Sequence, residues 1–351
     1  IYGLELFESI YYDVADESDR TTLTVAARER SWGPNYAQFG VAVFEDFEGP
    51  NFNLAAAYAR TAVNRLNGEW RTGVQIGQEP EAYSEFHQPL APSLRPFAYL
   101  KASIGERTDN VFDAGGNKIA ELGVRRGGVE LSGGRELGTW GEVRAGVIRE
   151  AGRFETIIGD PDAPDVEFET GELFVQLFAD ELDDVNFPSS GGAARIRMTA
   201  GRTEIGSDRD YEQAVFEGDG ACSIGRNTAR FGGYFATTRG GDSPYERLFH
   251  LGGFARLSGL ERREIAGQHA ALLSVMAYRR IADPGLLSMY AGLSLEYGNV
   301  FQEREEIAFD AGIWAGSAFL GLRTPIGPMF MAYGWAEGSR ENFYLFLGRS
   351  I

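Results

Sequence analysis

The sequence predicts an all-β protein, a 16-stranded antiparallel transmembrane β-barrel, on three observations. Glycine contributes 46 of 351 residues and aromatic residues 13%, a composition typical of many short antiparallel strands. Apolar and polar residues alternate through most of the chain after Asn35, with the period of two expected of strands that have one apolar face. Short connections alternate with longer ones, as they do in membrane-spanning barrels.

Residues 1–30 are predicted to form a short α+β segment that is separate from the barrel at 31–351. Tyr2–Ser9 is expected to end a short helix, and Ile10–Val14 and Thr21–Ala27 are expected to pair as a hairpin. One helix and one hairpin cannot bury a core of their own. We therefore interpret this segment as the end of a larger domain.

The alternation is clearest at 287–298, where Leu293 and Leu295 share an apolar face and Glu296 lies on the opposite, polar or small face. Segments of this kind number 16. Their expected spans are 35–45, 52–63, 69–78, 80–90, 94–106, 117–133, 140–152, 168–181, 192–205, 211–225, 227–240, 266–281, 286–299, 308–323, 328–337 and 341–351.

The connections after even-numbered strands are mostly short, with 182–191 as an exception, whereas 153–167 and 241–265 are long. A soluble β-sandwich would show the same alternation. It would not need so many consecutive strands without a helical break, so the pattern favours the barrel. The acidic loop 153–167 is interpreted as a solvated surface loop, with divalent cations near lipopolysaccharide as the alternative.

Several functional classes are disfavoured. A net charge of −18 argues against nucleic acid, which requires a basic surface. The single Cys222 excludes an internal disulfide and most cysteine metal sites, and His87, His250 and His269 are too scattered to suggest a metal. Residues 221–225 lack the first glycine of a nucleophile elbow. We expect no catalysis, no cofactor and no metal in this chain.

The segment Leu251–Leu260 is predicted to fold into the lumen of the barrel. Its glycines permit sharp bends or close backbone approach, and Phe254 and Leu257 would be costly to leave in water. The residues of this predicted lumen loop motif are Gly252, Gly253, Arg256, Ser258, Gly259 and Leu260.

Two further motifs carry a resemblance to the Omp85 superfamily of outer-membrane barrels. Gly316–Pro328, continuing to Tyr333-Gly334, resembles the penultimate hairpin of that superfamily. Leu295–Phe301 resembles its strand 13, in which an acidic residue, here Glu296, precedes a Gly-Asn-Val-aromatic run. The segment at 251–260 falls at the superfamily's sixth extracellular loop, which folds into the lumen.

The resemblance implies a location in a Gram-negative outer membrane. The end of a periplasmic POTRA domain would lie at 1–30, with the N-terminus in the periplasm. One branch is most similar, the type Vd autotransporters with a patatin-like phospholipase passenger, through Leu-Gly-Gly-Phe-x-x-Leu-Ser-Gly at 251–259, Tyr278–Arg280 and Trp32–Tyr36. The implied role is to anchor and translocate an upstream lipase passenger. A two-partner secretion transporter, a barrel-assembly factor and a passive porin remain alternatives.

The loop departs from the superfamily pattern at two positions. The usual arginine is replaced by Ser258 and the usual aromatic by Leu260. Arg256 lies two residues earlier, on the same side of an extended segment as Ser258. Our hypothesis is that Arg256 substitutes, reaching Glu296 with a charge-assisted hydrogen bond. Otherwise Glu296 is one more charge facing the lumen.

The final strand resembles the C-terminal signal read by the barrel-assembly machinery. Its alternation places four apolar residues on the lipid face, namely Phe343, Leu345, Leu347 and Ile351. Predicted partners are therefore outer-membrane lipid, lipopolysaccharide and that machinery. The first and last strands are expected to meet at a seam weakened by Gly40 and Gly348, which makes a homodimer conceivable.

Overall fold

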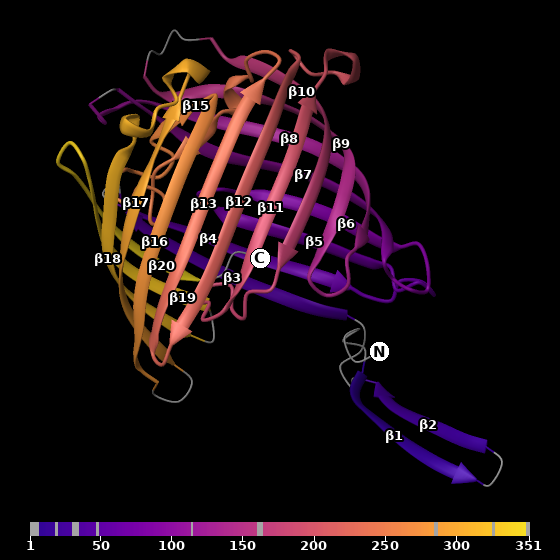
Figure 1. Cartoon of the computed structure of the whole chain (residues 1–351). Helices are drawn as coiled ribbons and strands as arrows, with labels where there is room; N and C mark the ends of the chain where they lie inside the picture. Colours follow the sequence, from indigo (N-terminus) through magenta and orange to yellow (C-terminus); the bar gives the residue numbers. More distant parts are fainter. Residues whose placement is uncertain are drawn as a thin grey trace.

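In the computed structural model, 16 antiparallel strands close into a single barrel (Figure 1). The structure describes residues 7–17, 20–29, 35–46, 49–113, 115–159, 164–283, 287–324 and 327–348. The barrel strands are β3 (Asn35–Asp46), β4 (Gly49–Arg60), β5 (Glu69–Gly77), β6 (Glu81–Pro89), β7 (Pro96–Phe112), β8 (Lys118–Glu136), β9 (Gly141–Ile158), β10 (Val166–Asp180), β11 (Gly191–Gly201), β12 (Tyr211–Ile224), β13 (Asn227–Arg239), β16 (His269–Ala282), β17 (Ser288–Phe301), β18 (Ile313–Thr324), β19 (Gly327–Ala336) and β20 (Arg340–Gly348).

The predicted fold class is confirmed, with errors at strand ends. β7, β8 and β9 extend beyond their expected spans, because their pairing continues past the apolar belt into stretches where polar residues hide the alternation. The strand expected from 308 begins at Ile313. Phe309–Ala311 forms the 3-10 turn η5 instead, in which the Ala311 N–H donates to the carbonyl oxygen of Ala308 at 3.2 Å.

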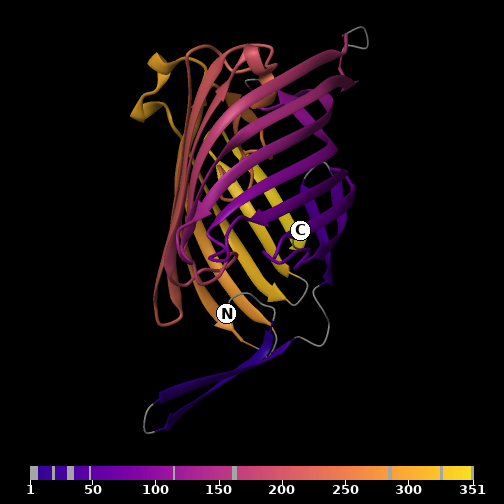
Figure 2. The same ribbon diagram turned by 90° about the vertical axis from the view of Figure 1, so that its right-hand side faces the viewer.

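The N-terminal residues form a hairpin outside the barrel, β1 (Phe7–Glu17) paired with β2 (Arg20–Glu29) (Figure 2). The expected hairpin is therefore present. The helix expected at Tyr2–Ser9 is wrong at residues 7–9, because Phe7 already pairs with Glu29 across the hairpin. Residues 1–6 of that expectation lie outside the described residues.

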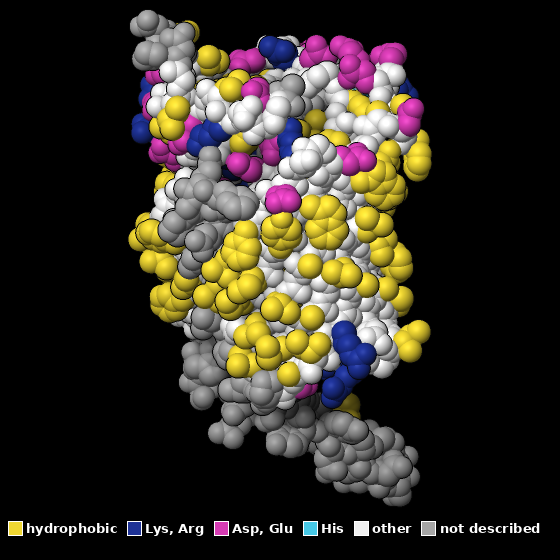
Figure 3. Space-filling view, turned by 90° about the vertical axis from the view of Figure 1, so that its left-hand side faces the viewer, with side chains coloured by type: hydrophobic (Ala, Val, Ile, Leu, Met, Phe, Trp, Pro, Cys, Tyr) yellow, Lys and Arg dark blue, Asp and Glu magenta, His cyan; other side chains and the backbone are white. Residues whose placement is uncertain are grey.

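The outer surface carries the apolar face of the alternation. Leu293 and Leu295 are 60% and 53% exposed, whereas Ser294 and Glu296 between them are buried. Figure 3 shows the consequence on one side of the molecule, where apolar side chains form a broad belt and acidic side chains gather at the end above it. The predicted orientation of this strand is confirmed.

The longest connection, between β13 and β16, turns into the barrel. It contains the 3-10 turn η3 (Tyr245–Arg247) and a small hairpin of β14 (Phe249–Leu251) and β15 (Ile265–Gly267). The described helices are single 3-10 turns, which also include η2 (Thr203–Ile205) and η4 (Arg304–Glu306). None of the helices in the described ranges is long and apolar enough to cross a membrane.

The first and last barrel strands meet, as predicted. The described pairing between β20 and β3 runs from Leu345 opposite Glu45 to Gly348 opposite Ala42. Gly348 has φ +128°, and a Cβ atom there would collide with the carbonyl oxygen of Val41. Glycine is therefore required where the two strands close the barrel.

Candidate functional site: a loop locked inside the barrel

The tip of the inward loop, 252–264, is a compact turn built on left-handed backbone. Gly252 and Gly253 have φ of +119° and +107°, values open to glycine at no steric cost. The N–H of Gly252 donates to the carbonyl oxygen of Arg256 at 2.8 Å, and that of Gly253 to Leu260 at 3.2 Å. The two glycines thus fold the segment back on itself, which is the sharp bend expected of them.

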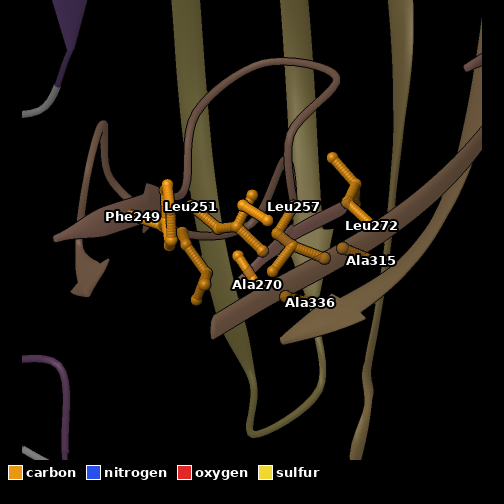
Figure 4. Close-up of a cluster of buried hydrophobic side chains, with 9 residues drawn as sticks. Phe249, Leu251, Leu257, Ala270, Leu272, Ala315 and Ala336 are labelled. Carbon is orange, nitrogen blue, oxygen red and sulfur yellow. The ribbon is translucent and has the colours of Figure 1, made fainter. Parts of the chain in front are cut away.

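Three leucines of the loop attach it to the barrel wall (Figure 4). Leu251, Leu257 and Leu260 are almost completely buried, and the cluster that they join includes small inward residues of β16, β18 and β19. These are Ala270, Ala315 and Ala336. Burying a leucine side chain contributes about 1.5–3 kcal/mol, so apolar packing is a large part of what holds the loop in the lumen.

Glu296 of β17 is the polar centre of this attachment. Its Oε2 accepts the backbone N–H groups of Leu257 and Ser258 at 2.6 and 2.7 Å, and its Oε1 accepts the Ser258 hydroxyl at 2.6 Å. The Ser294 hydroxyl also donates to Oε1, at 2.5 Å, and lies 2.7 Å from that of Ser317. The carboxylate is 1% exposed and both of its oxygens accept hydrogen bonds, which offsets the cost of burying its charge.

The loop backbone lies directly on the backbone of β19. A Cβ atom on Gly334 would collide with the carbonyl oxygen of Ser258, and one on Gly259 with the backbone N of Ala336. The Tyr344 hydroxyl of β20 donates to the carbonyl oxygens of Ser258 and Leu260, at 3.0 and 2.7 Å. The predicted motif residues Ser258, Gly259 and Leu260 are therefore brought together with Glu296.

The hypothesis that Arg256 reaches Glu296 is wrong. The Arg256 guanidinium lies over the ring of Tyr234, 4.6 Å from its centre, and among the described residues it makes no ion pair with Glu296. The physical reason is the tight turn: Glu296 is already surrounded by donors from Leu257 and Ser258. Ser258 thus contributes its hydroxyl and its N–H where an arginine was expected.

Sequence reasoning missed a second anchor at the root of the loop, Arg247. Its guanidinium pairs with Glu172 at 2.8 Å and Glu150 at 3.4 Å, and donates to the Thr170 hydroxyl at 3.1 Å. Burial alone would lower the pKa of Arg247, but the two carboxylates outweigh it and raise that pKa. These partners lie on β9 and β10, so the loop is tied to both sides of the lumen. No local motif could have signalled the pairing, since Glu172 lies 75 residues from Arg247.

A third contact ties the small hairpin to β7. Asp109 is 4% exposed and pairs with Arg107 at 3.0 Å and with Arg263 of the loop at 3.4 Å. His250 stands beside Arg263, and its Nδ1 is 2.9 Å from the carbonyl oxygen of Leu248. Burial and the neighbouring Arg263 lower the pKa of His250 to about 4, so the ring is neutral at pH 7.

The last strand has the predicted alternation. Asn342 is buried inside the barrel and Tyr344 contacts the lumen loop, which leaves Phe343, Leu345 and Leu347 on the outer face. Ile351 lies outside the described residues. That these side chains form an assembly signal stays a prediction. In the described ranges no group of three or more His, Cys, Asp and Glu side chains is placed to hold a metal ion.

No protein-family profile and no curated protein sequence matches the chain, but solved structures do. A structure of BamA from Haemophilus ducreyi lacking POTRA domains 1–3 has a TM-score of 0.75 at 13% identity, over 98% of this chain and 75% of that one. CdiB from Escherichia coli has a TM-score of 0.67 at 10% identity, over 97% of this chain and 68% of that one. CdiB from Acinetobacter baumannii has a TM-score of 0.65 at 9% identity, over 98% of this chain and 66% of that one. At these identities the likeness shows the fold alone, a closed 16-stranded antiparallel barrel.

Proposed function

We propose that this chain is an outer-membrane barrel that anchors and translocates a polypeptide. The apolar outer belt supports a lipid surrounding, because outward residues of a spanning barrel contact hydrocarbon. Outer-membrane lipid and lipopolysaccharide are then its surroundings, and the barrel-assembly machinery its route of insertion. The two longest connections, 240–268 and 302–312, lie at the end opposite the one where β3 begins, which supports a periplasmic N-terminus.

The observation that carries the proposal is that a loop is bound to Glu296 inside a closed barrel. Porins keep a continuous water-filled lumen, whereas here the apolar tip of a long loop is buried against one wall of the lumen. A segment held by hydrogen bonds and leucine packing occupies lumen space that a passive porin would leave open. This site therefore favours a gated translocator over a porin.

The cargo that we propose is a patatin-like phospholipase passenger upstream of Ile1, as in type Vd secretion. The Leu-Gly-Gly-Phe-x-x-Leu-Ser-Gly run at 251–259 supports this branch. Catalysis would belong to the passenger and none to this chain. A homodimer through the β3–β20 seam is part of the same proposal.

A second candidate is a two-partner secretion transporter or a barrel-assembly factor, favoured by the shared fold with CdiB and BamA. The two candidates differ in what precedes the barrel. The test is to express the native gene product with and without residues 31–351, and to digest intact cells with added protease. We expect a lipase region that is accessible at the cell surface only when the barrel is present. Several tandem POTRA-sized segments and no lipase region would contradict the passenger.

A further inference from the structure

A second segment enters the barrel, from the end opposite the lumen loop. It is the connection 181–190 between β10 and β11, whose length broke the pattern of short turns. Phe187 and Pro188 in it are buried, whereas Val185 is 79% exposed. Two apolar residues buried in the middle of a turn indicate that the turn packs against another part of the protein.

Phe187 is docked in an aromatic pocket on the far wall. Its ring stacks on Tyr290 of β17 with centres 4.2 Å apart, and on Phe330 of β19 at 4.9 Å. A Cβ atom on Gly321 of β18 would lie 2.5 Å from the ring, so this glycine makes room for it. In the barrel, β12, β13, β16, β17 and β18 lie between β11 and β19. To reach Phe330 the connection extends past these five strands along the inner wall.

Polar contacts fix the segment on both sides of Phe187. Asp184 pairs with Arg323 of β18 at 2.8 Å. The Tyr278 hydroxyl donates to the carbonyl oxygen of Pro188, and the Ser223 hydroxyl to that of Ser189 at 2.7 Å. These contacts come from three different strands, so the segment has one defined position.

The two inward segments meet on one aromatic residue. Phe254 of the lumen loop contacts Phe330 from above, with ring centres 5.6 Å apart, while Phe187 contacts the same ring from below. Both belong to one cluster with Tyr278, Tyr290 and Phe319. The barrel is thus narrowed from both ends along the same wall.

We propose that 181–190 is an autoinhibitory plug that closes the lumen at the end where β3 begins, with Phe187 as its anchor. Any polypeptide that enters the lumen from that end must first displace this plug from the pocket. The identity of that polypeptide rests on the proposed function; closure of the lumen does not.

The test is ion conductance of the 351-residue chain in planar bilayers without cargo. Phe187→Ala should raise the mean conductance several-fold, because it empties the pocket. Phe309→Ala is the matched control, since Phe309 is an 86% exposed loop aromatic and should leave conductance unchanged. If Phe187→Ala does not fold, Asp184→Lys tests the same docking by placing a like charge beside Arg323.

A tether gives the reverse experiment. In a Cys222→Ser background, Asp184→Cys with Arg323→Cys should raise conductance, and a short bis-maleimide cross-link should return it to the wild-type level. Equal conductance of Phe187→Ala and Phe309→Ala, or a cross-link confirmed by mass spectrometry with no effect on conductance, would overturn the plug. Because the conductance measurement uses no cargo, it tests closure of the lumen even if the export experiment contradicts the proposed passenger.

Discussion

The lumen has two unlike walls. From β16 to β20 the inward side chains are mostly small or aromatic, and both inward segments pack there. From β5 to β12 many are charged and pair with each other across strands, as Arg71 does with Glu85 at 3.5 Å and Arg144 with Glu130 at 3.6 Å. The difference teaches where a lumen segment can be held, since the first wall offers the two larger apolar clusters and the second only the smaller one of Val124, Phe154 and Phe168. The loop reaches the charged wall chiefly through the ion pairs of Arg247, together with the ring of Tyr245, which packs edge-on against Phe154 with ring centres 5.4 Å apart.

The largest effect is expected from Glu296→Gln, which breaks the polar lock on the small-residue wall. The amide oxygen would still accept the N–H groups of Leu257 and Ser258, but the amide NH2 would replace the oxygen that accepts the Ser258 and Ser294 hydroxyls. All four hydrogen bonds would lose their charge assistance, which costs roughly 3–5 kcal/mol together. Protease cleavage within the loop should become fast while the barrel keeps its heat-modifiable migration on a gel. Glu217→Gln is the control, because Glu217 is a partly exposed partner of Arg195 and should cost less than about 1 kcal/mol.

Next in size is Arg247→Met, which removes the link to the charged wall. It leaves the carboxylates of Glu172 and Glu150 without their buried cation, at a cost of about 3 kcal/mol. Thermal unfolding should shift downward, and cleavage should increase at the loop root rather than at its tip. Arg195→Met is the control, because the Arg195–Glu217 pair is more exposed. It should barely change the unfolding temperature or the rate of cleavage. If the two variants unfold alike, Arg247 is not an anchor.

Acid should weaken the hairpin contact through His250. Its pKa in the folded chain, about 4, lies below the ordinary value near 6.5. The stabilisation is therefore complete above about pH 6.5 and is lost as pH falls toward 4. The loss amounts to roughly 2 kcal/mol at pH 5. Loop cleavage should accelerate between pH 7 and pH 5 in the wild type and much less in His250→Asn. A pH dependence that persists in the variant would assign it to other groups.

Arg256→Ala should have the smallest effect. A cation over an aromatic ring contributes about 0.5–1 kcal/mol at a partly exposed site, and the Glu296 lock does not include this residue. Its loop should therefore be cleaved at nearly the wild-type rate. Cleavage as fast as in Glu296→Gln would contradict this account and indicate that Arg256 does contact Glu296.

The barrel was predictable because its signals are local. The period of two separates Leu293 and Leu295 from Glu296 without any knowledge of partners, and the glycines at 252 and 253 mark a turn by themselves. These features gave the 16 strands, the outer face and the inward loop. The helix expected at Tyr2–Ser9 is wrong at residues 7–9 because pairing with β2 overrides local preference there.

The contacts inside the lumen were not predictable in the same way. Glu296 is bound largely by backbone N–H groups, which every residue but proline carries, so no side-chain pattern marks its partners. Arg256 was expected instead because the resemblance places an arginine at the position of Ser258. Phe187 lies in a connection whose unusual length was visible, but its pocket is assembled from β16 to β19. Only the closed barrel brings those strands within its reach.

The most direct measurement of the lock is amide hydrogen exchange of the loop tip, residues 251–262, in the folded barrel. If Glu296 holds the tip against the small-residue wall, the amides of Leu257 and Ser258 exchange slowly in the wild type. In Glu296→Gln they should exchange fast, while β5–β9 stay protected. Fast exchange of both amides in the wild type, or equal protection in the two proteins, would contradict the lock.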